Sequence, residues 1–186
     1  EIERSLPTPL SISIYSACQL AASRRWRARI KDVKTAFLQS RKTARKQKLA
    51  CRQPRDEVLP GMHPEQLLLL ETEVYGLVSG PAWWRKSALH TLVNEFRYRV
   101  TSYDKCVLTL DSEHNKPGDL TSGITIIEID DLFEAGDERH IAKMDMLAQR
   151  FTFGKVVDVM AFVEGTFYAG RRMKQMSDFS FQVDMD

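Results

Sequence analysis

The chain has 186 residues, of which 43% are hydrophobic, and its formal net charge is only +2. This size predicts one domain, residues 1–186, that buries a single core. No apolar run approaches the roughly 20 residues that cross a bilayer, and no basic and then apolar signal segment opens the chain. We therefore expect a soluble, intracellular protein with no membrane partner.

The cysteines and histidines give no sign of a metal site. Cys18, Cys51 and Cys106 are widely spaced and odd in number, which indicates reduced, buried thiols rather than a disulfide framework or a zinc site. The four histidines are isolated and lack His-Glu-x-x-His spacing. We expect them at surface or core positions.

Positive charge gathers in one segment, from Arg24 to Arg52, in which Asp32 is the single acidic residue. Such a block attracts phosphate backbones by counterion release, although a solvated basic face is the alternative. An aspartate among cations is strongly ionised, and beside a phosphate-binding surface it is well placed to hold a metal.

The first predicted element is a helix that opens at Thr8, as its N-cap, and Pro9, and runs to about residue 23. A strand over residues 26–33 and a short helical turn over residues 35–39 follow. This order predicts that Asp32 lies where a strand ends.

Residues 53–64 are rich in proline and predict irregular structure, and residues 67–74 predict a buried strand. A second helix begins at Pro81. Its apolar residues recur every four positions and predict one buried stripe; they are Trp84, Ala88, Leu92 and Phe96.

The second half of the chain predicts a β-hairpin from residues 106–110 and 124–129, joined by a turn-forming loop at residues 115–119. The second strand leads into Asp130 and Asp131. An aspartate pair after a strand is usually a solvated turn, but an apolar strand holds such a pair rigidly.

Asp137 is placed to cap a helix that stops near Gly154. The tail, residues 179–185, alternates as a strand does and is expected to pair with the strand near Phe167 and Tyr168. Helices mixed with paired strands predict an α+β fold, with a sheet covered on one face.

Carboxylates are the hard oxygen ligands that divalent cations favour. If Asp32 lies beside Asp130 and Asp131, the three side chains can hold two Mg²⁺ or Mn²⁺ ions roughly 4 Å apart. Two ions at that separation activate a hydroxyl for attack on a phosphate and stabilise the leaving group.

Four motifs resemble the copia-type retrotransposon reverse transcriptases, and they follow in that family's order over nearly the whole chain. Residues 32–38 (DVKTAFL) resemble its first polymerase motif, and residues 129–132 (IDDL), followed by AGD, resemble its aspartate-pair motif. Between them, residues 74–84 (VYGLVSGPAWW) and 102–107 (SYDKCV) are similar to its Tyr-Gly-Leu turn with the following helix and to its next strand entry.

The resemblance implies a right-hand polymerase palm, an antiparallel sheet packed against helices, with incomplete fingers. It implies template-directed deoxynucleotidyl transfer to a primer 3′ hydroxyl, in which Asp32, Asp130 and Asp131 are the catalytic and metal-binding residues for two Mg²⁺ or Mn²⁺ ions. The implied partners are an RNA or DNA template with a DNA primer, deoxynucleoside triphosphates, and further modules of a Pol polyprotein through which it can oligomerise. A cytoplasmic particle or the nucleus is the implied location.

Further roles are implied by position in these motifs. Phe37 falls where the family has an aromatic steric gate against a 2′ hydroxyl, and Tyr75, Gly76, Ser79 and Gly80 fall in the nucleotide-binding segment. Core packing for the phenylalanine and simple turn formation for the others are the alternatives. The residues expected to contact nucleic-acid phosphates, unless they form an ordinary surface, are Arg24, Arg25, Arg27, Arg29, Arg171, Arg172 and Lys174.

The chain departs from the family pattern at several positions, namely Glu128 before the aspartate-pair motif, Glu71, Glu73 and Ser40. Glu128 shares a strand face with Asp130, where it either binds a cation or repels a primer phosphate. Against the family pattern, we also expect the upstream fingers and the thumb to be missing. The second hypothesis is therefore a catalytically inactive, truncated retrotransposon remnant that only binds nucleic acid, and a third is a chain whose incomplete core does not fold cooperatively.

Overall fold

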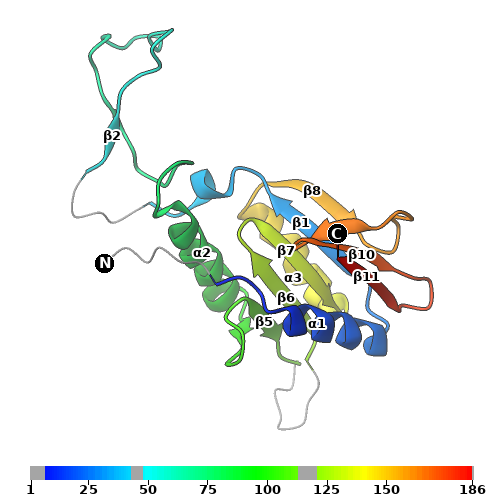
Figure 1. Ribbon diagram of the computed structural model, residues 1–186. Helices are drawn as coiled ribbons and strands as arrows, with labels where there is room; N and C mark the ends of the chain where they lie inside the picture. Colours follow the sequence, from blue (N-terminus) through cyan, green and yellow to red (C-terminus); the bar gives the residue numbers. More distant parts are fainter. Residues whose placement is uncertain (1–6, 43–47, 113–120, 186) are drawn as a thin grey trace.

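The computed structural model describes residues 7–42, 48–112 and 121–185. Over these residues the chain has an α+β fold with antiparallel sheets and three α-helices, as the sequence predicted (Figure 1). The predicted loop at residues 115–119 and the basic residues Arg45 and Lys46 lie outside the described residues. None of the helices in the described ranges has the length and apolar character needed to span a membrane.

The centre of the fold is a six-stranded sheet in the order β4-β5-β6-β7-β1-β8, in which every neighbouring pair is antiparallel. The pairing of β5 with β6 confirms the predicted hairpin. Its strands are β1 (Ala28–Val33), β4 (Arg99–Val100), β5 (Val107–Leu110), β6 (Gly123–Glu128), β7 (Asp131–Gly136) and β8 (Phe153–Asp158).

One face of this sheet is covered by α1 (Ser11–Arg24) and a small sheet in the order β11-β10-β9. The small sheet consists of β9 (Thr166–Tyr168), β10 (Arg171–Gln175) and β11 (Phe181–Met185). Ile14 from the helix, Ile30, Ile126 and Phe133 from the large sheet, and Met173 from β10 meet in one apolar core.

The other face is covered by α2 (Gly80–His90), with a π-helical turn (Thr91–Glu95), and by α3 (Glu138–Met146). Both faces are therefore buried, and the expectation of one covered face was wrong. The predicted stripe of α2 is confirmed, because its four members are at most 8% exposed. Asp137 caps α3 by accepting a hydrogen bond from the backbone N–H of His140 at 3.1 Å.

His140 fills a slot that two glycines leave open. Gly123 and Gly136 are cross-strand neighbours on β6 and β7, and a Cβ at either would lie within 2.4 Å of the imidazole. The ring is fully buried, its Nδ1 lies 2.9 Å from the Tyr98 hydroxyl, and burial lowers its pKa to about 3. A neutral histidine thus joins α3 to the sheet.

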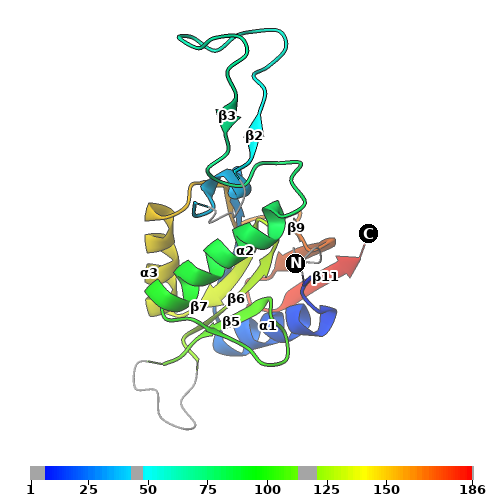
Figure 2. The same cartoon turned by 90° about the vertical axis from the view of Figure 1, so that its left-hand side faces the viewer.

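A two-stranded arm of β2 (Ala50–Cys51) and β3 (Leu68–Leu69) projects from the body (Figure 2). The buried strand predicted over residues 67–74 is wrong, because only two of these residues pair, and they pair within this arm. Leu67 and Leu69 are more than half exposed. Cys51 is also exposed, unlike the two other cysteines, so its predicted burial was wrong.

Other boundaries differ for identifiable reasons. The first helix begins at Ser11 rather than at Pro9, and Asp104 holds this end by accepting hydrogen bonds from Leu10 N at 2.9 Å and Ser13 Oγ at 2.5 Å. The helix capped by Asp137 ends at Met146, and a 3₁₀ turn (Leu147–Gln149) and then β8 follow. Strand β7 was not predicted, and the tail pairs with β10 rather than with β9.

Candidate functional site

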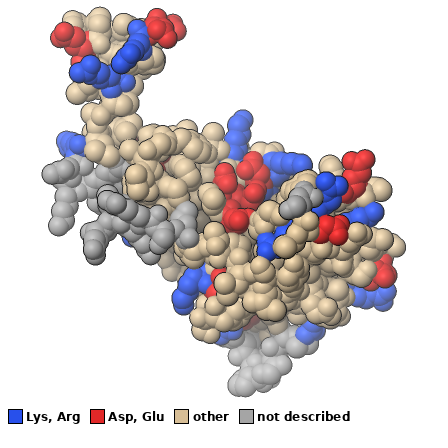
Figure 3. Space-filling view, viewed as in Figure 1, with Lys and Arg blue, Asp and Glu red and all other residues tan. Residues whose placement is uncertain are grey.

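Three carboxylates form a row across one end of the large sheet. Asp32 on β1 is directly opposite Asp131 on β7, and Asp131 is directly opposite Glu128 on β6. Opposed residues of paired strands point to the same face. Alternation along β1 places Asp32 on the face of Ile30, which α1 and the small sheet cover. Figure 3 shows acidic side chains gathered near the middle of this view, with cations beside them.

Asp130 joins this row from the turn between β6 and β7. Its carbonyl accepts a hydrogen bond at 2.9 Å from the backbone N–H of Val33, the residue after Asp32. Burial raises the pKa of its carboxyl group, and the negative charge of Asp32 raises it further. The prediction that Asp32 lies at a strand end close to the aspartate pair is therefore confirmed.

Mutual repulsion is strongest around Asp131. Burial raises the pKa of its carboxyl group to about 6, and the charges of Asp130, Asp32 and Glu128 add to that rise. Burial also raises the pKa of Glu128, against the opposing effects of Arg171 and of the Ala169 backbone N–H. A cation among these groups would relieve the repulsion.

Gly154 on β8 leaves the space that the Asp32 carboxylate occupies. A Cβ built on this glycine would lie 2.6 Å from Asp32 Oδ2, which is closer than such atoms approach. Any side chain here would therefore displace the carboxylate. Sequence reasoning missed this role, because it treated Gly154 as the end of a helix.

A cavity of about 170 Å³ opens beside the carboxylates. Asp32 and Asp131 form its acidic wall, and Lys155 adds a cation. The aromatic rings of Phe162 and Phe167 line it as well and are about half exposed. The cavity therefore combines anionic, cationic and apolar walls. The valines at positions 156, 157 and 159 were the signal for the β8 strand from which Lys155 extends.

The donor set fits divalent cations, although its members do not converge on one point. Among the residues that the structure describes, no three aspartate, glutamate, histidine or cysteine side chains lie close enough together to ligate one metal ion. The oxygens of Asp32, Asp130 and Asp131 are nevertheless hard donors of the kind that Mg²⁺ and Mn²⁺ prefer, and they are partly shielded from water.

The expected nucleotide-binding residues come together only in part. The ring of Phe37 lies 4.6 Å from that of Tyr75, and a Cβ on Gly80 would lie 3.3 Å from Phe37 Cδ2. Gly76 adopts a φ of 93°, which requires glycine. The Ser79 hydroxyl donates a hydrogen bond to Glu73 Oε2 at 2.7 Å.

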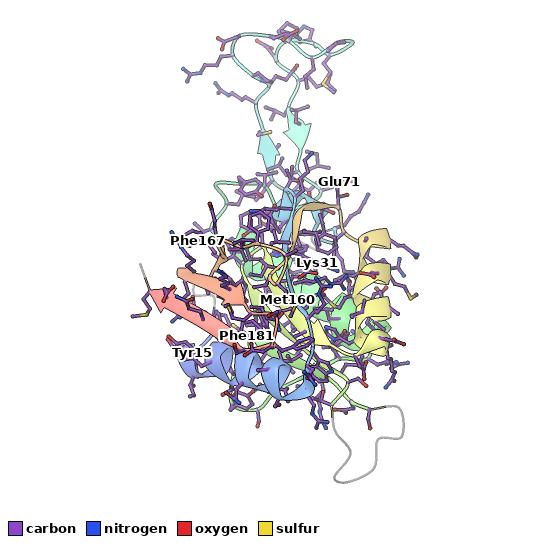
Figure 4. All side chains as sticks on the ribbon, turned by 90° about the vertical axis from the view of Figure 1, so that its right-hand side faces the viewer. Tyr15, Lys31, Glu71, Met160, Phe167 and Phe181 are labelled. Carbon is purple, nitrogen blue, oxygen red and sulfur yellow. The ribbon has the colours of Figure 1, made fainter. Side chains whose placement is uncertain are left out.

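The expected phosphate-binding cations are distributed over several surfaces. Arg29 lies on the face opposite Asp32, where it and Lys31 form ion pairs with Glu134 at 2.5 and 3.2 Å. Figure 4 labels Lys31, which lies beside α3 and donates to the Met144 carbonyl at 3.0 Å. Arg27 is paired with Asp158 at 2.6 Å. Arg27, Arg25 and Arg172 are exposed, whereas Arg24 at the end of α1 and Arg171 and Lys174 on β10 are half-buried.

Two of the β10 arginines lie over aromatic rings. Arg172 is 5.0 Å from the centre of the Phe167 ring, which lines the cavity, and Arg171 is 5.9 Å from that of Tyr15. Among the residues expected to bind phosphate, Arg172 thus contacts an aromatic ring of the cavity wall.

Comparison with protein-family models, curated proteins and solved structures finds no match to this chain. Its function is therefore inferred from its own residues and their arrangement.

Proposed function

We propose that this chain is a palm domain of the reverse-transcriptase type, which transfers a deoxynucleotide to a primer 3′ hydroxyl on an RNA or DNA template. The observation that carries the proposal is the direct opposition of Asp32 and Asp131 on β1 and β7, with Asp130 in the adjoining turn. The two segments are distant in sequence, and each resembles a polymerase motif. Their meeting at one end of an antiparallel sheet supports a shared catalytic role.

Asp32, Asp130 and Asp131 would hold two Mg²⁺ or Mn²⁺ ions. When bound, such ions supply activation of the 3′ hydroxyl and stabilisation of the leaving pyrophosphate. The chain itself holds the backbones of Asp32 and Asp131 on paired strands and that of Asp130 in the adjoining turn, so the side chains would need only to turn toward the ions. Lys155 offers a cation to a phosphate in the same cavity. The ring of Phe37, held against Tyr75, would crowd a 2′ hydroxyl and so favour deoxynucleotides.

A second function, nucleic-acid binding without catalysis, is favoured by the position of Glu128. This residue is the cross-strand partner of Asp131, so a fourth carboxylate stands in the row. It would repel the phosphate of an approaching primer end. A chain of this kind, a remnant of a retrotransposon polymerase, would bind nucleic acid through its surface arginines and leave the primer unextended.

Primer extension separates the two functions. A labelled DNA primer on an RNA template is incubated with the protein, deoxynucleotides and Mg²⁺ or Mn²⁺, and binding is measured in the same samples by anisotropy. We expect extension that Asp32→Asn abolishes without loss of binding, whereas Asp56→Asn, at the exposed tip of the arm, leaves it unchanged. Binding without extension by the wild-type protein would contradict the polymerase and support the second function.

A further inference from the structure

The turn that carries Asp130 is held in an unfavourable backbone conformation. β6 ends at Glu128 and β7 begins at Asp131, so Ile129 and Asp130 connect the two strands. Ile129 has a φ of 49°, in the left-handed region that β-branched residues avoid. Such strain persists only where surrounding groups fix the backbone. Burial of its own side chain does not do so, because that side chain is 46% exposed.

Trp84 fixes this turn from the sheet face that α2 and α3 cover. Its indole Nε1–H donates a hydrogen bond to the carbonyl oxygen of Ile129 at 2.7 Å. The side chain is 1% exposed, and its ring meets that of Phe151 edge-on, with centroids 4.9 Å apart. The donor therefore comes from a ring that has no freedom to move away.

Asp130, the second residue of the turn, is held by the neighbouring strand β1. The backbone N–H of Val33 donates to the carbonyl of Asp130 at 2.9 Å. Both carbonyls of the turn are thus fixed, one by α2 and one by β1, and Val33 directly follows Asp32. The Trp84 bond is the contact that acts on the strained residue itself.

We propose that Trp84 is a positioning residue, whose indole N–H holds the strained turn so that Asp130 and Asp131 stay beside Asp32. The catalytic consequence of this role rests on the proposed function, but the structural role does not. Trp84 contacts no reacting group and acts through the backbone of Ile129. The role differs from that of an ordinary core residue because it depends on one hydrogen bond and on the strain at one position.

The test compares Trp84→Phe with Trp83→Phe. Both substitutions remove an indole donor from adjacent residues of α2, but Trp83 donates to the carbonyl of Arg41, at 2.9 Å. Amide hydrogen exchange at residues 129–131 is measured by NMR. We expect Trp84→Phe to accelerate this exchange about tenfold, as loss of one hydrogen bond does, and Trp83→Phe to leave it unchanged. Equal exchange in Trp84→Phe and the wild-type protein would overturn the proposal.

Relief of the strain at Ile129 provides a second test. Glycine tolerates a positive φ, so Ile129→Gly should make the turn far less dependent on Trp84. In that background Trp84→Phe should change the exchange about twofold or less, and if Trp84→Phe alone does not fold, Ile129→Gly should restore folding. An undiminished effect, or no rescue, would show that Trp84 acts only through packing and would overturn the proposal.

Extension kinetics separate this proposal from the proposed function. In an active chain, Trp84→Phe should lower kcat about tenfold and leave the KM for the deoxynucleotide unchanged. Absence of extension in the wild-type protein would contradict the polymerase function alone, because the exchange measurement still decides the role of Trp84. A raised KM with unchanged kcat would contradict a role in holding the aspartates.

Discussion

Replacing Asp131 with asparagine should stabilise the metal-free protein at neutral pH. Its carboxyl group has a pKa raised from 3.8 to about 6 by burial and by the charges of Asp130, Asp32 and Glu128. The ionised form is therefore disfavoured in the folded state. Asparagine has nearly the same shape and carries no charge, so it removes this repulsion with little change in packing.

The sign and size follow from proton linkage. Because the pKa is higher in the folded than in the unfolded state, the folded state binds more protons between about pH 4 and pH 6, and stability falls as pH rises through that window. A difference of about two pH units corresponds to at most ~3 kcal/mol. The side chain is only partly buried, so solvent screening reduces the expected effect to about 1–2 kcal/mol.

Urea unfolding in EDTA between pH 4 and pH 7.5 measures this effect. The free energy of unfolding of Asp131→Asn should exceed that of the wild-type protein by about 1–2 kcal/mol at pH 7.5 and equal it at pH 4. Asp56→Asn, on the exposed arm, is the matched control. Excess Mg²⁺ should stabilise the wild-type protein and not the variant, because only the wild-type site binds it. A difference that does not vary with pH would refute the repulsion.

Three further substitutions test contacts at the site and in the core. Gly154→Ala should displace the Asp32 carboxylate and lower the affinity for Mn²⁺, measured by electron paramagnetic resonance, about tenfold or more. Gly123→Ala should destabilise the protein in urea by about 1–3 kcal/mol, because a Cβ there would lie 2.1 Å from His140 Nδ1, and should cost far less in a His140→Ala background. Glu134→Gln should lower the free energy of unfolding by about 1–3 kcal/mol, because it removes the buried partner of Lys31 and leaves the ammonium group to the exposed Asp145 carboxylate, at 3.6 Å.

Each of these substitutions has a control and a contradicting result. Gly61→Ala adds a methyl group in open space at a φ of 78°, so it strains only the backbone of the arm and should leave Mn²⁺ affinity unchanged. Glu95→Gln removes a partly exposed ion pair with Arg150 and should cost less than about 1 kcal/mol. Unchanged affinity in Gly154→Ala, additive effects of Gly123→Ala and His140→Ala, or a small effect of Glu134→Gln would contradict the respective contact.

Local patterns were sufficient to predict several parts of the fold. A strand end at Asp32, the β5–β6 hairpin, the buried stripe of α2 and the Asp137 cap depend on residues close together in sequence, and the structure has all of them. The start of α1 was not predictable in this way, because the carboxylate that holds the residue before it, Asp104, comes from a distant segment.

The arrangement of the site depends on strand register, which no local pattern specifies. The row of Glu128, Asp131 and Asp32 exists because β7 pairs with both β6 and β1 in one particular register, and a shift by one residue would turn Asp131 to the other face. The segment 24–52 looked like one basic surface in sequence. Alternation along β1 instead sends Arg29 and Lys31 to the face opposite Asp32.

The most direct test of a carboxylate-centred polymerase site is incorporation of a single deoxynucleotide into a primer annealed to an RNA template. Wild-type protein is compared with the Asp130→Asn, Asp131→Asn double variant, with duplex binding and thermal unfolding measured on the same preparations. We expect Mg²⁺- or Mn²⁺-dependent incorporation by the wild-type protein alone and duplex binding by both. Equal incorporation by both proteins, or a folded wild-type protein that binds the duplex and adds no nucleotide, would contradict this expectation.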